Sequence, residues 1–410
     1  MKKAVVKQLG THLWAAAVAA VWFMFLALPL LAVRVDTLHQ VVEWRWRVLL
    51  WVGLGVFILV LLWRWGAEWR QRYLAGRAPN SAPLAAVARR LCEEPLLYRP
   101  ALGVLVGAAL LFPWLVDTYQ ANIMGLALIF VVLGLGLNIT VGLAGLLDLG
   151  YIAFFAIGAY CYALLNTRYG LGFWTCLPLG GLTGALCGVL LGFPILRLRG
   201  DYLAIVTLGF GAIAKIVFEN WEELFGGAQG IAGVARPRLF ALEMGTGAVT
   251  IYLYYLLLAL AALTAFVTRR LQHSRIGRAW VALREDEIAC AAMGVDVART
   301  KLTAYACGAF WAGLVGVVFA ARNTYINPNS FTFLESALVL SIVVLGGMGS
   351  LVGVVIAALV LVLLPEYLRA FADYRMLVFG AVMVLMMILR PQGLIVARRR
   401  RYLARQGEGG

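Results

Sequence analysis

Charged residues are scarce in this 410-residue sequence: Asp, Glu, Lys and Arg make up 13% of it, whereas a soluble domain carries about 25%. Hydrophobic residues make up 63%. A water-soluble globular domain is therefore excluded. The 35 Lys and Arg outnumber the 20 Asp and Glu, but membrane topology explains this excess, so binding to nucleic acid is not predicted.

Residues that build metal centres, disulfides and catalytic sites are also few. The six cysteines have no C-x-x-C spacing, and His12, His39 and His273 lie far apart, so neither a zinc site nor a disulfide framework is predicted. The G-x-x-x-x-G-K-[ST], H-E-x-x-H and G-x-S-x-G motifs are absent. We therefore expect no metal, no cofactor and no ATPase or other enzymatic site in this chain.

Long apolar runs dominate the sequence instead. A spanning helix needs roughly 20 mostly apolar residues. Apolar runs lie at 13–33, 48–63, 101–116, 121–139, 151–165, 174–195, 202–218, 249–268, 303–321, 337–346, 351–364 and 376–390. The first lacks a signal-peptide cleavage site and is interpreted as a retained span. Several are short, so we predict an all-α, polytopic transmembrane bundle with broken or re-entrant helices.

The distribution of basic residues predicts the orientation. With the N-terminus inside, most Lys and Arg fall on the inner side, in 1–12, 64–100, 196–201, 269–301 and 390–410, as the positive-inside rule requires. Both termini are then cytoplasmic. A single crossing over 337–364 would place Arg398–Arg401 outside. The sequence therefore predicts two short helices there, joined at the glycine-rich segment 346–350.

Three regions follow from this pattern. Residues 1–100 form an accessory region with two spans and a basic inner linker, and residues 101–394 form the transport core. Residues 395–410 form a basic cytoplasmic tail. In the core, Gly180, Gly184, Gly188 and Gly192 recur every four residues, which places them on one helix face and predicts close helix packing.

Polar residues and glycines interrupt an apolar run between 138 and 151. Irregular backbone at membrane depth is tolerated where it is buried in protein or lines a cavity. One interpretation is a broken helix whose free backbone groups hold an amino acid; the other is that Asp148 caps a helix starting near Gly150. Both stay open. The candidate pathway residues are Asn138, Gly142, Gly145, Asp148, Gly150, Tyr151, Glu335, Gly346, Gly347 and Gly349.

Ionisable residues inside the predicted spans are rare. They comprise Asp148 at the interruption, Glu335 near a boundary, and Lys215, which is placed to pair with Glu219 four residues later. Proton-coupled carriers use chains of such groups. An ion-coupled secondary carrier is therefore less favoured, and energy is expected to come from another protein.

The segment 269–301 is too long for a hairpin turn between spans. Acidic residues begin a predicted short helix over 285–293, and Gly294 stands where a helix ends. Its small side chains suit a groove of a partner protein, and an amphipathic helix on the membrane surface is the alternative. The candidate coupling residues are Glu285, Asp286, Glu287, Ile288, Ala292 and Gly294.

Several segments together resemble a known family. These are 132–165, RLRGDYLAIVTL at 197–208, 275–301, INPNSFTFLESALVLSIVVLGGMGSLVG at 326–353 and RPQGL at 390–394. They are similar to the LivM-type permease of high-affinity branched-chain amino acid ABC transporters, within the LivH/LivM permease family. VEWRWR at 42–47 also resembles the N-terminal extension of that type.

The resemblance implies a permease subunit of an ATP-driven importer of Leu, Ile and Val. Its implied partners are an H-type permease in a heterodimer, two cytoplasmic ATP-binding subunits that hold ATP and Mg, a periplasmic amino-acid-binding protein and membrane lipid. The implied location is the bacterial inner membrane, and the segment 274–294 corresponds to a coupling helix. Urea, short amides or other amino acids remain alternative cargoes.

Overall fold

The computed structural model describes residues 107, 109–195, 198, 200–237, 246–367, 380, 384 and 393–395, together with the backbone of two strands. The chain divides into two compact units, Met1–Leu105 and Val106–Gly410. In the first unit, β1 (Val33–Asp36) pairs antiparallel with β2 (Val41–Trp44). Most of the apolar runs predicted at 13–33, 48–63 and 376–390, and nearly all of the basic tail, lie outside the described residues.

The second unit is almost entirely helical where it is described, which confirms the predicted all-α class. Its longer helices are α5 (Thr118–Leu137), α6 (Ile152–Tyr169), α7 (Phe173–Ile195), α8 (Asp201–Asn220), α10 (Thr246–Gln272), α11 (Arg275–Glu285), α13 (Val297–Asn323), α14 (Phe333–Gly346) and α15 (Leu351–Tyr367). Short helical segments are η2 (Asn138–Leu143, π-helical), α9 (Glu222–Phe225), η3 (Gly227–Gln229), α12 (Glu287–Ala292) and η4 (Pro328–Ser330). The short strands β3 (Ile231–Ala232) and β4 (Tyr325–Ile326) form an antiparallel pair.

Among the described residues, six helical segments are long and apolar enough to cross a membrane. They are α5 with η2, α7, α8, α10, α13, and α14 together with the preceding residues from Pro328. The shorter apolar helix α15 follows α14 after the turn at 347–350. This hairpin confirms that 337–364 is divided at its glycines.

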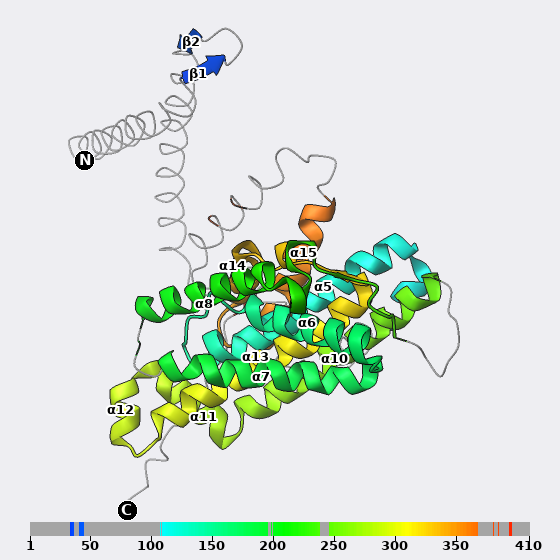
Figure 1. Cartoon of the computed structure of the whole chain (residues 1–410). Coiled ribbons are helices and arrows are strands. Elements are labelled where there is room, and N and C mark those ends of the chain that lie inside the picture. The colour runs from blue at the N-terminus through cyan, green and yellow to red at the C-terminus, as the bar shows by residue number, and fades with distance from the viewer. Residues whose placement is uncertain are drawn as a thin grey trace, which may run out of the picture. The chain divides into compact units, whose positions relative to one another are not determined.

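Helices α5 and α13 form the centre of this unit. Of their most apolar stretches, 89% and 78% are buried, whereas only 22% of the corresponding stretch of α8 is buried. In Figure 1, α7, α13 and α10 lie along one another, and α11 and α12 lie together at one end of the bundle. We call this end the α12 end, and we call the opposite end, which carries the paired strands β3 and β4, the β3–β4 end.

The predicted glycine stripe of α7 packs against α13. A Cβ added at Gly184 would lie 2.6 Å from the backbone oxygen of Ala309, and one at Gly188 would lie 3.0 Å from that of Tyr305. Gly180 is next to Val317 and Gly192 is next to Leu302, so the two helices run antiparallel. Glycine allows the backbones to approach this closely, and the packing prediction is confirmed.

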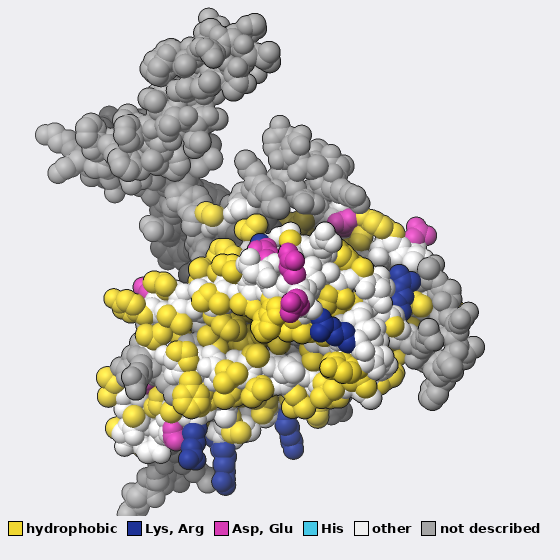
Figure 2. All heavy atoms as spheres, in the orientation of Figure 1, with side chains coloured by type: hydrophobic (Ala, Val, Ile, Leu, Met, Phe, Trp, Pro, Cys, Tyr) yellow, Lys and Arg dark blue, Asp and Glu magenta, His cyan; other side chains and the backbone are white. Residues whose placement is uncertain are grey.

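The surface of the second unit has the character of a membrane protein. Hydrophobic side chains cover most of the face shown in Figure 2, and Lys and Arg side chains gather at its lower and right margins. The predicted Lys215–Glu219 pair is present at 3.2 Å, near the end of α8. This arrangement supports a multi-pass membrane protein with polar residues concentrated toward the two ends of the bundle.

Candidate functional site

The interruption after α5 is shorter than the sequence predicted. Helix α5 continues as η2 to Leu143, and the next helix starts at Ile152, so the non-helical stretch covers 144–151. Asn138 and Gly142 are therefore helical residues and not part of the break. The wider π-helical turns keep the backbone hydrogen-bonded through these polar and glycine residues, which the sequence pattern does not reveal.

Asp148 lies in this break and is completely buried. Its Oδ1 atom accepts a hydrogen bond from the backbone N–H of Gly150 at 3.0 Å. Helix α6 begins at Ile152, whose N–H donates to Ser336 Oγ at 3.1 Å. The interpretation of Asp148 as the N-cap of a helix starting near Gly150 is therefore wrong, because the carboxylate closes a turn before that helix. Within the described residues, Asp148 Oδ2 has no hydrogen-bond partner.

Helices α13 and α8 hold the break in place, in addition to α14, which carries Ser336. The Tyr151 hydroxyl donates to the backbone oxygen of Gly308 on α13 at 2.9 Å, and the backbone N–H of Leu149 donates to Thr207 Oγ1 on α8 at 3.0 Å. A Cβ added at Gly150 would lie 2.0 Å from the backbone oxygen of Thr207, so only glycine permits this approach. Helix α8 thus covers the break directly.

The two glycine-rich segments of the sequence meet in the folded chain. Asn138 Oδ1 accepts a hydrogen bond from the backbone N–H of Gly349 at 2.8 Å. A Cβ added at Gly142 would lie 2.7 Å from that same nitrogen. Gly347 and Gly349 have φ values of 102° and 87°, which favour glycine and produce the tight turn between α14 and α15.

Other predicted pathway residues occupy different surroundings. Gly145 has a φ of 72° and lies against the side chain of Arg284, and Gly346 lies against the backbone of Gly353. Glu335 is in the first turn of α14 and partly buried. Among the described residues, no hydrogen bond or ion pair joins its carboxylate to the break.

The short helix predicted over 285–293 is present but shorter than expected. Helix α12 covers Glu287–Ala292, whereas the sequence predicted 285–293. Glu285 is the last residue of α11, and Asp286 separates the two helices in extended conformation. The Oδ1 atom of Asp286 accepts hydrogen bonds from the N–H groups of Ile288 and Ala289 at 2.8 and 3.0 Å, so capping by Asp286 sets the start of α12. Gly294 has a φ of 80° and follows the end of the helix, as predicted.

Helix α12 presents apolar side chains to the solvent at the end of the bundle. Ile288 is 68% exposed and Met293 is 84% exposed. Ala292 is also exposed, whereas Cys290 is buried against the rest of this chain. The expected row of small side chains is therefore divided between an inner and an outer face.

Sequence reasoning did not identify the residues that fasten this element to the bundle. Lys301 Nζ on α13 forms an ion pair with Glu287 Oε1 at 2.9 Å, and the Lys301 side chain is only 1% exposed. Arg284 on α11 donates to the backbone oxygen of Gly142 in η2. Trp280 Nε1 donates to the backbone oxygen of Thr300 at 3.1 Å. Lys301 is one of only five lysines in the chain, and this rarity could have marked it as a residue with a specific role.

No group of three or more His, Cys, Asp or Glu side chains within the described ranges could hold a metal ion. The break and the α12 segment (residues 287–293) contain one buried carboxylate oxygen without a hydrogen-bond partner, exposed apolar side chains and a buried ion pair. They lack the adjacent nucleophile and base that acyl or phosphoryl chemistry requires.

Comparison with known proteins identifies the family. A family model described as the permease component of branched-chain amino acid transport systems matches residues 119–387. The chain is 46% identical over 391 residues to the high-affinity branched-chain amino acid transport permease LivM of Escherichia coli K12, covering 89% of this chain and 88% of that protein.

More distant relatives include other transport permeases. Identity is 24% over 289 residues to the permease LivH of Salmonella typhimurium, covering 65% of this chain and 91% of that protein. Identity is 27% over 299 residues to the ribose import permease RbsC of E. coli K12, covering 68% and 84%. No solved structure matches the chain. From the family match and the near full-length similarity to LivM, the chain belongs to the LivM-type permeases of the branched-chain amino acid transport family.

Proposed function

We propose that this chain is a membrane permease subunit of an ATP-driven importer of branched-chain amino acids. The near full-length identity of 46% to a LivM permease carries this proposal. The lower similarity to LivH over most of that protein supports a second permease of the H type as the partner in a heterodimer. The absence of a phosphate-binding loop from the sequence supports two separate ATP-binding subunits, which would hold ATP and Mg.

The α12 end is proposed to face the cytoplasm and the ATP-binding subunits. Five exposed arginines between residues 269 and 301 support this orientation, because the positive-inside rule places Lys and Arg on the cytoplasmic side. They are Arg269, Arg270, Arg275, Arg278 and Arg299. The exposed side chains of Ile288 and Met293 would enter a groove of an ATP-binding subunit, since short helices bind grooves through such apolar anchors. The opposite end would then face the periplasm of a bacterial inner membrane and receive the loaded amino-acid-binding protein.

Two contacts would transmit a movement of α12 into the helix bundle. The Glu287–Lys301 pair would transmit a displacement of α12 to α13, and the contact of Arg284 with Gly142 would transmit it to η2. A buried ion pair suits this role because separating its charges in a low-dielectric interior is costly. The helices would therefore move together with α12.

The break is proposed to form part of the translocation pathway. Asp148 is completely buried and α8 covers the segment, so the pathway would be closed here and would open when α8 moves away. The low burial of α8 favours such a movement because few contacts restrain it. The turn between α14 and α15 would belong to the same pathway, because its Gly349 is hydrogen-bonded to Asn138.

The proposed function is tested by purifying the tagged chain in mild detergent and identifying the proteins that accompany it. We expect a second permease and two ATP-binding subunits. The complex is then reconstituted in proteoliposomes with ATP inside and supplied with leucine-loaded binding protein outside. Leucine uptake and stimulated ATP hydrolysis are expected. Uptake by the chain alone, driven by an ion gradient without ATP, would contradict the proposal.

A further inference from the structure

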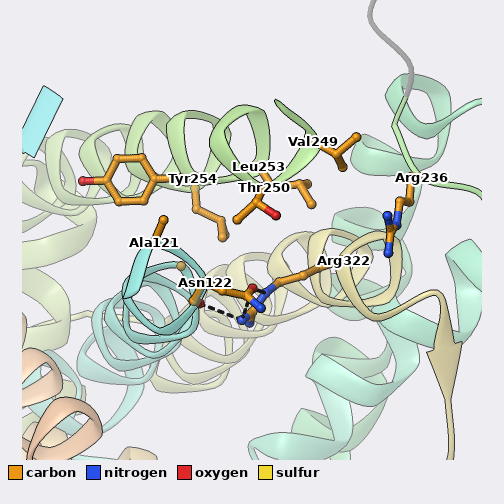
Figure 3. Close-up of a pocket in the computed structure, with 10 residues that line it drawn as sticks. Ala121, Asn122, Arg236, Val249, Thr250, Leu253, Tyr254 and Arg322 are labelled. Atoms are coloured by element: carbon orange, nitrogen blue, oxygen red, sulfur yellow. Dashed lines mark hydrogen bonds between the residues drawn. The ribbon is translucent and has the colours of Figure 1, made fainter. Parts of the chain in front are cut away.

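A partly enclosed cavity of about 110 Å³ lies at the β3–β4 end of the bundle. It is formed by the first turns of α5, the first half of α10, the last residues of α13 and the segment after β3. Figure 3 shows α10 along one side of this cavity and Asn122 on α5 facing Arg322 on α13. The cavity is separate from the break at 144–151 and from α12.

The guanidinium group of Arg322 is held in a fixed orientation at this cavity. Its Nε donates to Asn122 Oδ1 at 3.0 Å, and its Nη2 donates to the side-chain and backbone oxygens of Asn122, both at 2.7 Å (Figure 3). These acceptors are neutral. Within the part of the chain that the structure describes, Arg322 forms no ion pair with a carboxylate.

A partly buried guanidinium without an anionic partner indicates an anionic ligand, because charges removed from water are normally paired. A carboxylate matches the planar donor geometry of arginine particularly well. Arg236 also lines the cavity and adds a second positive charge at its edge. The described lining residues include no Asp or Glu. The cavity thus favours a carboxylate and provides no countercharge for an ammonium group.

The remaining walls of the cavity are apolar. Leu257, Leu253 and Val249 on α10 are 0%, 5% and 8% exposed, and they line the cavity together with Ala121 and Gly125 of α5. The volume accommodates several water molecules, or a carboxylate group with a short aliphatic chain. Such a lining of hydrophobic side chains with few polar groups is typical of small-molecule sites.

We propose that this cavity is an entry site that binds the carboxylate and the short aliphatic chain of the cargo and is indifferent to its ammonium group. This inference rests on the proposed function for the direction of transport and the class of cargo. Helix α13 connects the two regions, because Lys301 and Arg322 lie 21 residues apart on it, roughly 30 Å at 1.5 Å per residue. Occupation of the cavity and movement of α12 therefore act on the two ends of one continuous helix.

The test uses the complete wild-type complex in proteoliposomes, supplied with saturating leucine-loaded binding protein. Two probes are added outside: 4-methyl-2-oxopentanoate, which retains the carboxylate and the aliphatic chain but has no ammonium, and leucinol, which retains the ammonium and has no carboxylate. We expect the oxo acid to inhibit leucine uptake and leucinol to have no effect. Retention of leucine by the isolated binding protein is measured with each probe, so that displacement from that protein is detected.

Two substitutions locate the effect in the cavity. Arg322→Gln should weaken inhibition by the oxo acid and raise the KM for leucine by about tenfold or more, as expected for a lost charge-assisted hydrogen bond. Gly125→Ala should raise the KM for leucine more than the KM for valine, because the added methyl narrows the apolar part of the cavity and leucine has the longer side chain. A Cβ there would lie 3.8 Å from Leu257 Cδ1, an ordinary contact, so the fold should tolerate it.

The matched controls lie outside the cavity. Arg168→Gln removes an arginine that donates to the backbone oxygens of Glu223 and Leu224 at the same end of the bundle. Gly209→Ala adds a methyl to α8 where a Cβ would meet nothing within 4 Å. Both variants should show the wild-type response to the oxo acid and the wild-type ratio of KM values.

The possible results are distinguishable. The entry-site proposal is overturned if leucinol and the oxo acid inhibit uptake equally, or if Arg322→Gln leaves inhibition by the oxo acid unchanged. In either case ATP-driven leucine uptake by the wild-type complex would still support the proposed importer. If Arg322→Gln instead weakens docking of empty and loaded binding protein equally, the guanidinium serves a carboxylate of that partner and the entry site is rejected. Absence of ATP-driven leucine uptake in the wild-type complex would reject the proposed function itself.

Discussion

Asn138 and Gly349 are 211 residues apart in the sequence, and a buried hydrogen bond of 2.8 Å joins them in the folded chain. The side-chain oxygen of Asn138 accepts from the backbone nitrogen of Gly349, so a polar residue in η2 completes the turn between α14 and α15. The two glycine-rich interruptions of the sequence are therefore parts of one contact region at the α12 end.

Replacing Asn138 with Ala should lower the free energy of unfolding by about 1–3 kcal/mol, because the buried N–H of Gly349 loses its acceptor. Asn138→Asp retains an acceptor oxygen, although it introduces a buried ionisable group. Thermal unfolding of the purified protein in detergent would measure the change. The control is Asn220→Ala, which removes an exposed side chain that donates to the backbone oxygen of Ile216. Similar unfolding temperatures for both alanine variants would contradict the importance of the Gly349 contact.

Breaking the Glu287–Lys301 pair should separate ATP hydrolysis from transport. Lys301→Met leaves the Glu287 carboxylate without this buried partner, and removal of one member of such a pair costs about 3–5 kcal/mol. We expect the assembled complex to hydrolyse ATP while leucine uptake falls by about tenfold or more, since the link to α13 is lost. Both rates are measured on the same proteoliposomes.

The control for this prediction is the exposed pair Arg299–Asp296, which has a similar N–O distance of 3.1 Å. The Arg299 and Asp296 side chains are 87% and 53% exposed, so Arg299→Met should change stability by no more than about 1 kcal/mol. A wild-type ratio of uptake to ATP hydrolysis in Lys301→Met would rule out the proposed transmission through α13.

Close backbone contact between α6 and α13 should make Gly158 intolerant of any side chain. A Cβ there would lie 2.0 Å from the backbone oxygen of Gly313, and backbone cannot give way as a flexible side chain does. Gly158→Ala should therefore destabilise the protein by about 1–3 kcal/mol or more. The comparison is Gly209→Ala, where the added methyl has open space. Unfolding of the two variants in detergent gives the measurement, and equal stability would refute the close packing.

The exposed apolar side chains of α12 should be needed for assembly and not for folding of this chain. Ile288→Ser and Met293→Ser change side chains that are 68% and 84% exposed, so unfolding should shift by no more than about 0.5 kcal/mol. Co-purification of ATP-binding subunits should nevertheless fall. Trp174→Ser, at the opposite end and 55% exposed, is the control. Undiminished recovery of the ATP-binding subunits with both serine variants would exclude α12 as their contact.

Local chemistry made several features predictable. Apolar length and glycine spacing predicted α7 and its packing face, and glycines at 346–350 predicted the hairpin between α14 and α15. Gly294 correctly marked the end of α12. The beginning of α12 was misplaced because three consecutive acids suit a first helical turn equally, and only the hydrogen bonds to Asp286 select one of them as the cap.

The role of Asp148 was less predictable from the same kind of reasoning. A carboxylate before a glycine is compatible with an N-cap and with a turn, and the choice depended on which group satisfied the first N–H of α6. Ser336 from α14 supplies that acceptor, 184 residues away in the sequence. Asp148 remains buried in the turn, with one oxygen bonded to Gly150.

The sequence by itself determined that this protein lies in a membrane, where most spans of the described core lie along the chain, and to which family the chain belongs. These features are predictable because apolar length, charge distribution and short motifs are local properties. Tertiary structure alone decided which distant residues meet. The burial of Lys301 against Glu287, the contact of Asn138 with Gly349 and the cavity beside Arg322 each depend on how separate helices pack. The packing of the whole bundle brings these residues together, and no local pattern of residues specifies which distant residues will meet.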